Sequence, residues 1–567
     1  MQGRSRLDRE LLDAEMIAGH LVPPGSVFAF LAEHRAELFP DSFTADLFPS
    51  RTGRPSLPAD LVGAVLVLKE LHDLSDPQTA DALKFDIRWK VACGRSLTQM
   101  SFDPSTLVYW RRRIAASSRP DRVFDAVAAV IAETGILAGR RKRCVDSTVF
   151  DDAVATQDTV TQLVAAIRKV ARVVDGAAEV IAAVCALDYS RPGKPGIDWD
   201  DPAAKEALVS ALVNDALAVL AELTADGAPQ REAAGADALG LLALVAGQDV
   251  EPAEDSDGTD GRWRIARKVA PGRVISTVDR EARHTRKSKP KRRDGFRGHV
   301  AAEPGTGLIT DCEMTMAAGE GGTDAENGVK MASRDRFRPS PPAAAGGGPA
   351  GPVPGAEREN AAAGGSDDAR PQAGAGAEAR QGPDARLEVY GDSAYGSGQA
   401  RADYRDAGHD TIIKPGPLRP AVPGGFTCDD FTVDEEQGTV TCPAGQVRQM
   451  SKTRTVTFGA ACAACPMRSL CTTARDGRSM TIHLHDGLLR AARTQARTEE
   501  FKRAYPTRAS IERTIAWTAT QNGRRVRLRY IGTAKNNAWL HNRCAGLNLR
   551  TLVKAGLTRA GGAWALA

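Results

Sequence analysis

Three carboxylates stand where they could converge on a pair of metal ions. Asp146 and Asp392 each follow a short apolar segment that predicts a strand, and Glu512 lies in a segment with helical periodicity. Cleavage of a phosphodiester requires stabilisation of charge on the attacking and leaving oxygens, which two divalent cations held by carboxylates from different elements provide. Oxygen ligands of this kind suit Mg²⁺ or Mn²⁺. Asp151 and Asp152 are alternatives for the first carboxylate, and because the chain has 71 Asp and Glu residues, each position alone is weak evidence.

The residues before Glu512 form a more specific pattern. In "YPTRASIE", Tyr505, Arg508 and Glu512 are spaced so that a helix would carry all three on one face. The ordinary explanation is a surface ion pair between Arg508 and Glu512, worth about 0.3 kcal/mol. The functional alternative is a metal-binding carboxylate flanked by an arginine and a tyrosine that contact a phosphate.

Five of the ten cysteines fall between 428 and 471, a density that argues against ordinary buried thiols. Four of them follow the spacing C-x19-C-x2-C-x5-C: Cys442, Cys462, Cys465 and Cys471. Four thiolates from two short clusters suit tetrahedral Zn²⁺, and they leave no open coordination position for catalysis, so the predicted zinc is structural. Cys428, His483 and His485 remain alternative ligands.

Clustered basic residues predict contacts with nucleic-acid phosphates, although the net charge is only +4. The clusters lie in "VYWRRRIA", "RHTRKSKPKRRDGFRGH" and "RRVRLR", and the candidate residues in them are Arg111, Arg112, Arg113, Arg292, Arg293, Arg524 and Arg525. The first cluster belongs to the second of two predicted helices, one running from a cap at Ser75 to Gly94 and one capped at Asp103 with Pro104 in its first position. Such a pair fits a helix-turn-helix DNA binder, and equally an ordinary helical bundle with a solvated basic face.

Composition and periodicity divide the chain into segments. Residues 1–140 and 156–260 are predicted to be helical, strands are predicted at "RWRIARKV" and "RVISTVD", and a hairpin is predicted around "EPGTG". Residues 333–385 are rich in Pro, Gly and Ala and have few apolar side chains that could form a core. This segment is therefore predicted to be a disordered linker or insertion. The remaining segments are a first core strand at 141–155, core strands at 261–332, a core strand with the second aspartate at 386–420, a Cys-rich insertion at 421–485, and a core helix with a basic tail at 486–567.

Taken together, these motifs resemble the bacterial insertion-sequence transposases of the DDE type, and most of all their IS-eleven-eighty-two group. The resemblance rests on "VDST" at 145–148, "GDSAYGSG" at 391–398 and the Tyr-x2-Arg-x3-Glu pattern at 505–512. The stretches "GRPSLPADLV", "LSDPQTADAL" and "FDPSTLVYWRRR" are similar to the N-terminal helical domain of that group, and "STVDREARHTRKSKPKRRDGFRGHVAAEPGTGLIT" is similar to its central strands.

The resemblance implies an α/β fold with three parts: an RNase H-like mixed-sheet catalytic core, an all-helical N-terminal DNA-binding domain and a small zinc-ribbon-like insertion. It implies that Asp146, Asp392 and Glu512 form the catalytic triad that binds Mg²⁺. It also implies that Tyr505 and Arg508 contact DNA near the reacting phosphate.

One position departs from the wider transposase signature. A lysine is expected seven residues after the glutamate, and this chain has Ala519 there. The contacts of that lysine would then come from Arg524 or Arg525, or be absent.

The implied activity is that of a transposase that binds its element's terminal inverted repeats, cuts with metal-activated water and joins the freed 3′-OH to target DNA. Synapsis of two ends implies a homodimer or larger assembly on DNA. The chain has no uncharged apolar run long enough to span a membrane and no signal-peptide core at its start, which predicts a cytoplasmic, nucleoid-associated protein with no membrane partner. Two alternatives are a nuclease without strand transfer and a catalytically inactive, zinc-containing DNA-binding relic, which the 333–385 tract suggests.

Overall fold

A six-stranded mixed sheet forms the centre of the protein. The computed structural model describes residues 1–5, 12–50, 52–225, 232–288, 291–338 and 386–567. The sheet order is β4-β5-β1-β7-β8, with β6 also paired to β5, and β1 runs antiparallel to β5 and parallel to β7. Its strands are β1 (Lys142–Asp151), β4 (Arg283–Ser288), β5 (Lys291–Ala302), β6 (Ile309–Met316), β7 (Glu388–Gly391) and β8 (Asp410–Ile413). The fold is therefore mixed α/β, and the predicted hairpin around "EPGTG" is confirmed as β5–β6.

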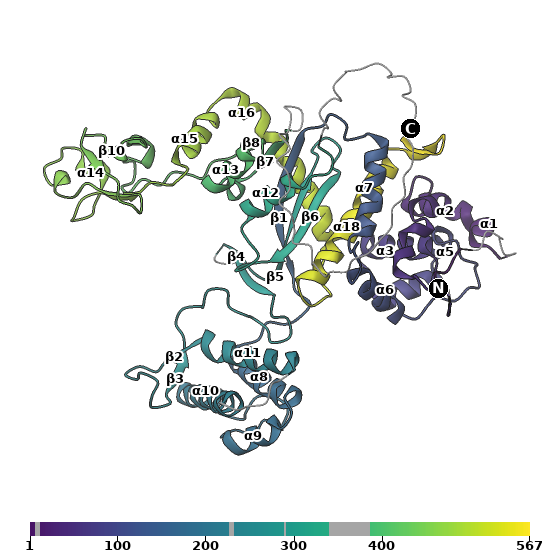
Figure 1. Ribbon diagram of the computed structural model, residues 1–567, viewed down its shortest axis with the longest axis horizontal. Coiled ribbons are helices and arrows are strands. Elements are labelled where there is room, and N and C mark those ends of the chain that lie inside the picture. Colours follow the sequence, from purple (N-terminus) through teal and green to yellow (C-terminus); the bar gives the residue numbers. More distant parts are fainter. Residues whose placement is uncertain (6–11, 51, 226–231, 289–290, 339–385) are drawn as a thin grey trace, which may run out of the picture.

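Helices cover both faces of the sheet, as Figure 1 shows. They are α7 (Arg122–Thr134) and α18 (Thr533–Lys554) on one face and α12 (Asp324–Ser333) and α13 (Gly398–Asp406) on the other. Along β1, Cys144 and Phe150 belong to the large core on the α18 side, whereas Val145 belongs to the smaller core under α12 and α13. Because successive strand residues face opposite sides, Asp146 shares the side of Cys144, and Ser147 points toward α12.

The N-terminal part of the described chain is helical and packs against α18 (Figure 1). Its helices are α1 (Ala14–Ala18), α2 (Val27–Leu38), α3 (Ala59–Leu71), α4 (Asp76–Phe85), α5 (Ile87–Ala92) and α6 (Ser105–Ala115). The capping box of Ser75 with Gln78 is confirmed, but the single helix predicted up to Gly94 is wrong. The backbone is extended at Asp86, whose carboxylate instead accepts the Arg88 N–H and begins α5. The next helix begins at Ser105, one residue later than predicted.

Residues 159–265 form a separate helical layer with its own apolar core. The elements are α8 (Thr159–Val173), α9 (Ala177–Val184), α10 (Pro202–Thr224), α11 (Ala233–Gln248), β2 (Val250–Pro252) and β3 (Trp263–Ile265). By length and composition alone, α10 is the one helix in the described parts of the chain that could cross a membrane. Its residues Leu212, Val213 and Ala216 are buried in the core of this layer.

The strand predicted at "RVISTVD" does not form. Only Val274 makes a bridge there, with Arg283. The hydroxyl of Ser276 accepts the backbone N–H groups of Val278 and Asp279, and this local turn takes the donors that a strand would have used.

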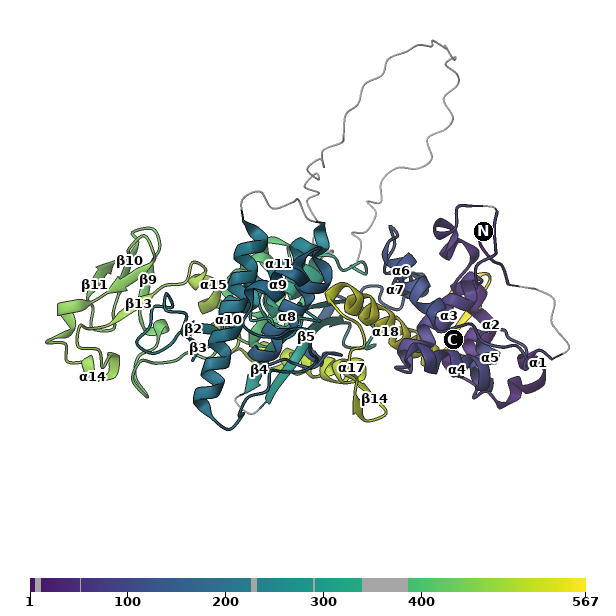
Figure 2. The same cartoon turned by 90° about the horizontal axis from the view of Figure 1, so that it is seen from below.

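The Cys-rich part is a small module of short strands, and Figure 2 shows it at the opposite end of the molecule from the N-terminal helices. It comprises β9 (Thr432–Asp434), β10 (Thr439–Thr441), β11 (Val447–Gln449), β12 (Thr455–Thr457), α14 (Arg468–Cys471) and β13 (Ser479–Thr481). A cluster around Phe431, Val440, Val456 and Phe458 gives the module a minimal core of its own.

The long helical pattern predicted near the C-terminus is divided into short pieces. They are α15 (Asp486–Gln495), α16 (Glu499–Ala504), the 3₁₀ turn η8 (Tyr505–Arg508) and α17 (Ala509–Ala519), followed by β14 (Thr520–Gln521), β15 (Arg524–Arg525), β16 (Leu557–Ala560) and β17 (Ala563–Leu566). The side chain of Thr498 caps α16, and Pro506 lies in the first turn of η8. Proline lacks the N–H that a continuous helix needs, so the chain redirects there and α17 approaches the sheet. The predicted disordered tract at 333–385 lies almost wholly outside the described residues.

Candidate active site

The parallel pairing of β1 and β7 brings Asp146 and Asp392 together, although Asp146 lies within β1 and not at the strand end that the sequence predicted. Cys144 on β1 is paired in register with Tyr390 on β7, so the residues two positions further along each strand are neighbours at the same edge. Asp392 directly follows β7, and its carboxylate accepts the N–H of Ala394 to begin the short turn η5 (Ser393–Tyr395). Asp392 is therefore a turn former, but one whose carboxylate remains 43 % exposed beside its neighbouring strand.

Arg508 gathers the three predicted catalytic carboxylates around one guanidinium. Its Nη2 donates to Asp146 Oδ2 over 3.1 Å and lies 3.9 Å from Asp392 Oδ2, while its Nη1 donates to Glu512 Oε1 over 3.0 Å. The i,i+4 pairing with Glu512 spans the junction between η8 and α17. Residues from β1, from the end of β7 and from α17 thus meet at a single point.

The electrostatics of this point favour a cation. Burial raises the pKa of Asp146, and the nearby carboxylates of Asp392 and Asp324 raise it further, against the Ser147 N–H and Arg508, which lower it. Tyr505 lies close enough to feel the same carboxylates, and burial is the main cause of its raised pKa. Its ring stacks on Phe501, with the centroids 5.2 Å apart.

The donor set fits a hard divalent cation. Asp146, Asp392 and Glu512 offer only oxygen atoms, and they come from three separate elements, as a two-metal phosphodiester site requires. Within the described residues no three His, Cys, Asp or Glu side chains are close enough to hold a metal ion. At this site the Arg508 guanidinium stands between the carboxylates and balances their charge, so the carboxylates and the arginine form one compact polar unit.

The alternative first carboxylates lie elsewhere. Asp151 is five residues beyond Asp146, roughly 16 Å along the strand, and pairs with Arg293. Asp152 is buried, and burial together with the Asp279 carboxylate raises its pKa to about 6. The structure brings Asp146, and neither of these, to Arg508.

The candidate arginines of the N-terminal helices are mostly engaged within the protein. Arg111 pairs with Asp76 over 2.5 Å and lies over the Tyr530 ring, 5.1 Å from its centroid. Arg113 donates to the backbone carbonyl of Leu47. Arg112 is exposed and is the member of this cluster that points into solvent.

The candidate arginines near the sheet divide in the same way. Arg293 pairs with Asp151. Arg292, Arg524 and Arg525 are exposed, and Arg525 also donates to the carbonyl of Val149. Arg524 and Arg525 form the second strand of the β14–β15 hairpin, just past the buried Ala519.

Four cysteines surround one small cavity of about 20 Å³ in the Cys-rich module: Cys442, Cys462, Cys465 and Cys471. Three aromatic side chains, Phe426, Phe431 and Phe458, close the cavity. Burial is the main cause of the raised pKa of the Cys471 thiol; the other three cysteines raise it further, and Arg478 opposes them. The structure therefore brings together the four predicted zinc ligands, although no metal-binding group of three such residues is found in the described chain.

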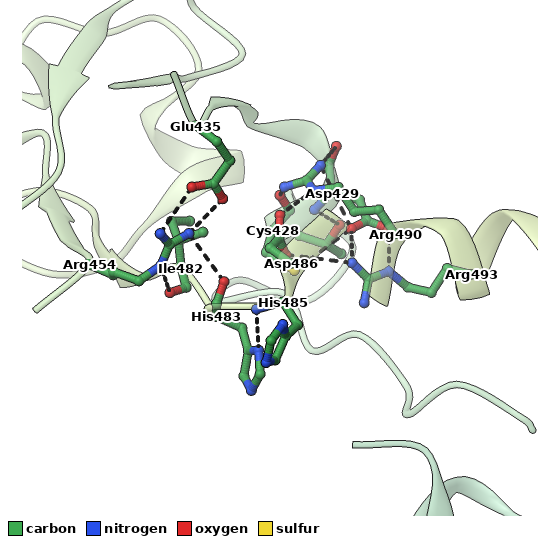
Figure 3. A network of polar contacts seen from close by, with 11 residues as sticks. Cys428, Asp429, Glu435, Arg454, Ile482, His483, His485, Asp486, Arg490 and Arg493 are labelled. Carbon is green, nitrogen blue, oxygen red and sulfur yellow. Dashed lines mark hydrogen bonds and ion pairs between the residues drawn. The ribbon is translucent and has the colours of Figure 1, made fainter. Parts of the chain in front are cut away.

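The alternative zinc ligands are placed outside that cavity, in the polar junction shown in Figure 3. Arg490 and Arg493 on α15 hold this junction: Arg490 donates to the carbonyl of Cys428 and pairs with Asp486 over 2.5 Å, and Arg493 pairs with Asp429 over 2.5 Å. The rings of His483 and His485 lie beside it, and His485 bonds to Gln399 on α13. These residues dock the Cys-rich module onto α15 and α13.

Two residues near the carboxylates were not expected from the sequence. Asp324 begins α12 and accepts a hydrogen bond from Ser147 over 2.9 Å, and Tyr395 lies buried beneath the turn that Asp392 starts. The Thr-x-x-Glu capping box at Thr323 could have located the start of α12, but nothing in the order of residues shows that this helix end reaches β1.

Comparisons with known families match two separate parts of the chain. Residues 19–113 match the transposase domain DUF772, and residues 441–553 match the transposase DDE domain. The second match contains the Cys-rich residues and Glu512. No curated protein and no solved structure was found to match. The match to a transposase domain among the N-terminal helices and the match to a DDE domain that contains Glu512 together support a DDE-type insertion-sequence transposase.

Proposed function

We propose that this transposase binds the terminal inverted repeats of its element, cleaves the DNA there and transfers the 3′-OH end to target DNA. The observation that carries the proposal is the meeting of Asp146, Asp392 and Glu512 at Arg508 from three different elements. The arrangement suits an RNase H-like core and the IS-eleven-eighty-two group, which the sequence resembles.

The three carboxylates would hold Mg²⁺ or Mn²⁺. When bound, the cations would activate the attacking water and stabilise charge on the leaving oxygen. The middle of β1 fixes Asp146, the end of β7 fixes Asp392, and α17 supplies Glu512. Arg508 is held at the same point and is long enough to turn toward a phosphate, with which a guanidinium forms paired hydrogen bonds. Tyr505 lies beside it, where it would contact the same strand.

DNA contacts beyond the active site fall to the exposed arginines. Arg112, Arg292, Arg524 and Arg525 are exposed and would neutralise phosphates, although Arg525 also donates to the carbonyl of Val149. Arg111, Arg113 and Arg293 are only partly exposed and have partners within the protein. Arg524 and Arg525 follow Ala519 on the β14–β15 hairpin, so they would supply the contact made by lysine in the wider signature. The N-terminal helices would recognise the element ends.

The Cys-rich module would hold a structural Zn²⁺. Its four thiols come from two short clusters and line one small cavity, a donor set that suits tetrahedral zinc and leaves no open position. A metal there would add to a core that is otherwise only a few apolar side chains. Because two ends must be brought together, the active form would be a dimer or larger assembly on DNA, working in the cytoplasm at the nucleoid.

An assay with two substrates tests the function. An intact element end should be nicked in Mg²⁺, and a pre-cut end with a free 3′-OH should be joined to target DNA. A nuclease would cut the first substrate and give no joined product from the second. A DNA-binding relic would retain end binding and show neither reaction.

A further inference from the structure

The residue after Asp146 connects the active site to the opposite face of the sheet. The backbone N–H of Ser147 donates to Asp146 Oδ1 over 2.8 Å. Its side chain points the other way, and its hydroxyl donates to Asp324 Oδ1 over 2.9 Å. Ser147 therefore holds one oxygen of Asp146 on one side of β1 and is itself held from the other side.

Asp324 is anchored firmly enough to act as a fixed support. It occupies the first position of α12, where the helix dipole favours a carboxylate, and its side chain is 15 % exposed. Arg297 Nη1 donates to Asp324 Oδ2 over 2.9 Å. Both carboxylate oxygens of Asp324 thus have a partner on the sheet, Ser147 on β1 and Arg297 on β5.

Two buried polar groups complete the surroundings of Asp324. The side chain of His299, on β5 directly opposite Ser147, is fully buried, with Nδ1 3.6 Å from Asp324 Oδ1 and Nε2 at Thr315. The hydroxyl of Tyr395 is buried beside the Ser147 side chain and among the carboxylates of Asp324, Asp146 and Asp392. Burying several polar groups close together reduces the stability of the fold unless each is held where it can interact with its neighbours.

We propose that Asp324 is a positioning residue for the catalytic centre and that it acts through Ser147 on Asp146. The chain of contacts runs from Arg297 to Asp324, to the Ser147 hydroxyl, and through the Ser147 N–H to Asp146 Oδ1. It leaves Asp146 Oδ2, the oxygen that Arg508 contacts, to face the cation and the DNA. This inference rests on the proposed function, because it assumes that Asp146 is a metal ligand.

Metal binding is the readout that separates positioning from folding. Mn²⁺ titrated calorimetrically into the full-length protein reports on the site without requiring catalysis. Partners that orient a metal ligand typically change metal affinity 10–100-fold when they are removed. We expect Asp324→Asn to weaken Mn²⁺ binding within that range and to raise the Mg²⁺ concentration needed for half-maximal cleavage, with binding to end DNA unchanged.

Two further variants define the route of the effect. Ser147→Ala, a small change that the fold should tolerate, is expected to weaken Mn²⁺ binding in the same direction. The double variant Ser147→Ala/Asp324→Asn should be no weaker than Asp324→Asn alone, because both changes break one chain of contacts. Additive losses would show that Asp324 acts by another route and would overturn the proposal.

The matched control lies one residue away. The hydroxyl of Thr323 caps α12 through the N–H of Glu326, so Thr323→Ala loosens the same helix end without touching Ser147. Thr323→Ala should leave the affinity for Mn²⁺ unchanged. If it lowers that affinity as much as Asp324→Asn does, Asp324 acts only by stabilising the helix. Asp146→Asn separates a failure of the proposed catalytic site from a failure of the positioning role of Asp324. If Asp146→Asn binds Mn²⁺ like the wild type, the proposed catalytic site is wrong. If it loses Mn²⁺ while Asp324→Asn and Ser147→Ala do not, only the positioning role fails.

Discussion

Arg508 donates a hydrogen bond to Asp146 over 3.1 Å, although 362 residues separate the two in the chain. The contact joins the turn that precedes α17 to the central strand of the sheet. It also places a permanent positive charge at the point where the carboxylates of Asp146 and Glu512 meet. A divalent cation bound between these carboxylates would have to compete with this arginine, which links metal binding to the position of Arg508.

Removing the arginine should therefore strengthen metal binding and weaken catalysis. In the absence of DNA, we expect Arg508→Ala to bind Mn²⁺ about tenfold more tightly, since it lacks the competing charge-assisted hydrogen bonds. Cleavage of element ends should nevertheless fall, because the phosphate loses its guanidinium partner. Calorimetry and a cleavage assay measure the two effects. Arg513→Ala is the matched control, because Arg513 follows Glu512 but lies over the Trp517 ring. If Arg508→Ala binds Mn²⁺ with unchanged affinity, Arg508 does not compete with the cation and has only a structural role.

The stability of the protein should depend on the ionisation of Asp152. Burial and the carboxylate of Asp279 raise the pKa of Asp152 to about 6, from an ordinary value near 4 in the unfolded chain. The folded state therefore binds the proton more tightly, and its stability falls as the pH rises from about 4 to about 6. Asp152→Asn removes this penalty while keeping an acceptor for the N–H of Ala153. Above pH 6 it should stabilise the fold by on the order of 2 kcal/mol, an advantage that disappears below pH 4.

Thermal unfolding of the wild type and Asp152→Asn at several pH values checks this expectation. Asp406→Asn, at an exposed ion pair with Arg405, should change stability by less than about 0.5 kcal/mol at every pH. A variant at Asp152 that is less stable than the wild type at pH 8 would mean that the charged carboxylate is stabilised in the fold.

The four-cysteine cavity should contain zinc in protein purified without chelators. Elemental analysis is expected to show one Zn²⁺ per chain, and Cys465→Ser should lose most of it. Because the module has few apolar side chains, metal loss should expose residues 421–485 to limited proteolysis and leave the sheet intact. Cys428→Ser is the control, since Cys428 lies in the junction with α15 and not in the cavity. Equal zinc loss in both variants would overturn this choice of ligands.

The two neighbouring arginines of α6 should affect DNA binding differently. Arg112 is exposed, so Arg112→Ala should weaken binding to element ends and reduce the dependence of log Kd on log salt concentration by about one unit. Arg111→Ala should act through stability instead, because it removes one of the two cations that pair with Asp76, Arg111 and Lys69. Binding isotherms across a salt series measure the slope. A full salt slope in Arg112→Ala would exclude a phosphate contact at this position.

Local patterns predicted much of the architecture. A short apolar segment indicated β1, the turn "EPGTG" indicated the β5–β6 hairpin, and the capping box at Ser75 marked the start of α4. The errors came where side chains compete for backbone groups: Asp86 divides a predicted helix, and Ser276 turns a predicted strand. Both side chains bond to backbone groups close to them in the chain. Whether these bonds replace the helix or strand hydrogen bonds depends on how the neighbouring elements pack.

The candidate site was predictable only in part. The spacing of Arg508 and Glu512 showed that they share a face. The end of a predicted strand marked Asp392 correctly, whereas Asp146 lies within β1 and not after it. The grouping of these residues came from family resemblance. Asp324 could not be found in this way, because its contact with Ser147 spans 177 residues and depends on α12 packing across the sheet. The alternative zinc ligands also became distinguishable only when the module's folding separated them from the cavity.

The most direct test of the central claim is Mg²⁺-dependent cleavage of a labelled element end by Asp392→Asn, beside Asp406→Asn from the end of α13. We predict that Asp392→Asn binds the end with wild-type affinity and cuts at least 1,000-fold more slowly, because its activation barrier is about 4 kcal/mol higher, while Asp406→Asn cuts like the wild type. Cleavage by Asp392→Asn at the wild-type rate would contradict the assignment of Asp146, Asp392 and Glu512 as the catalytic carboxylates.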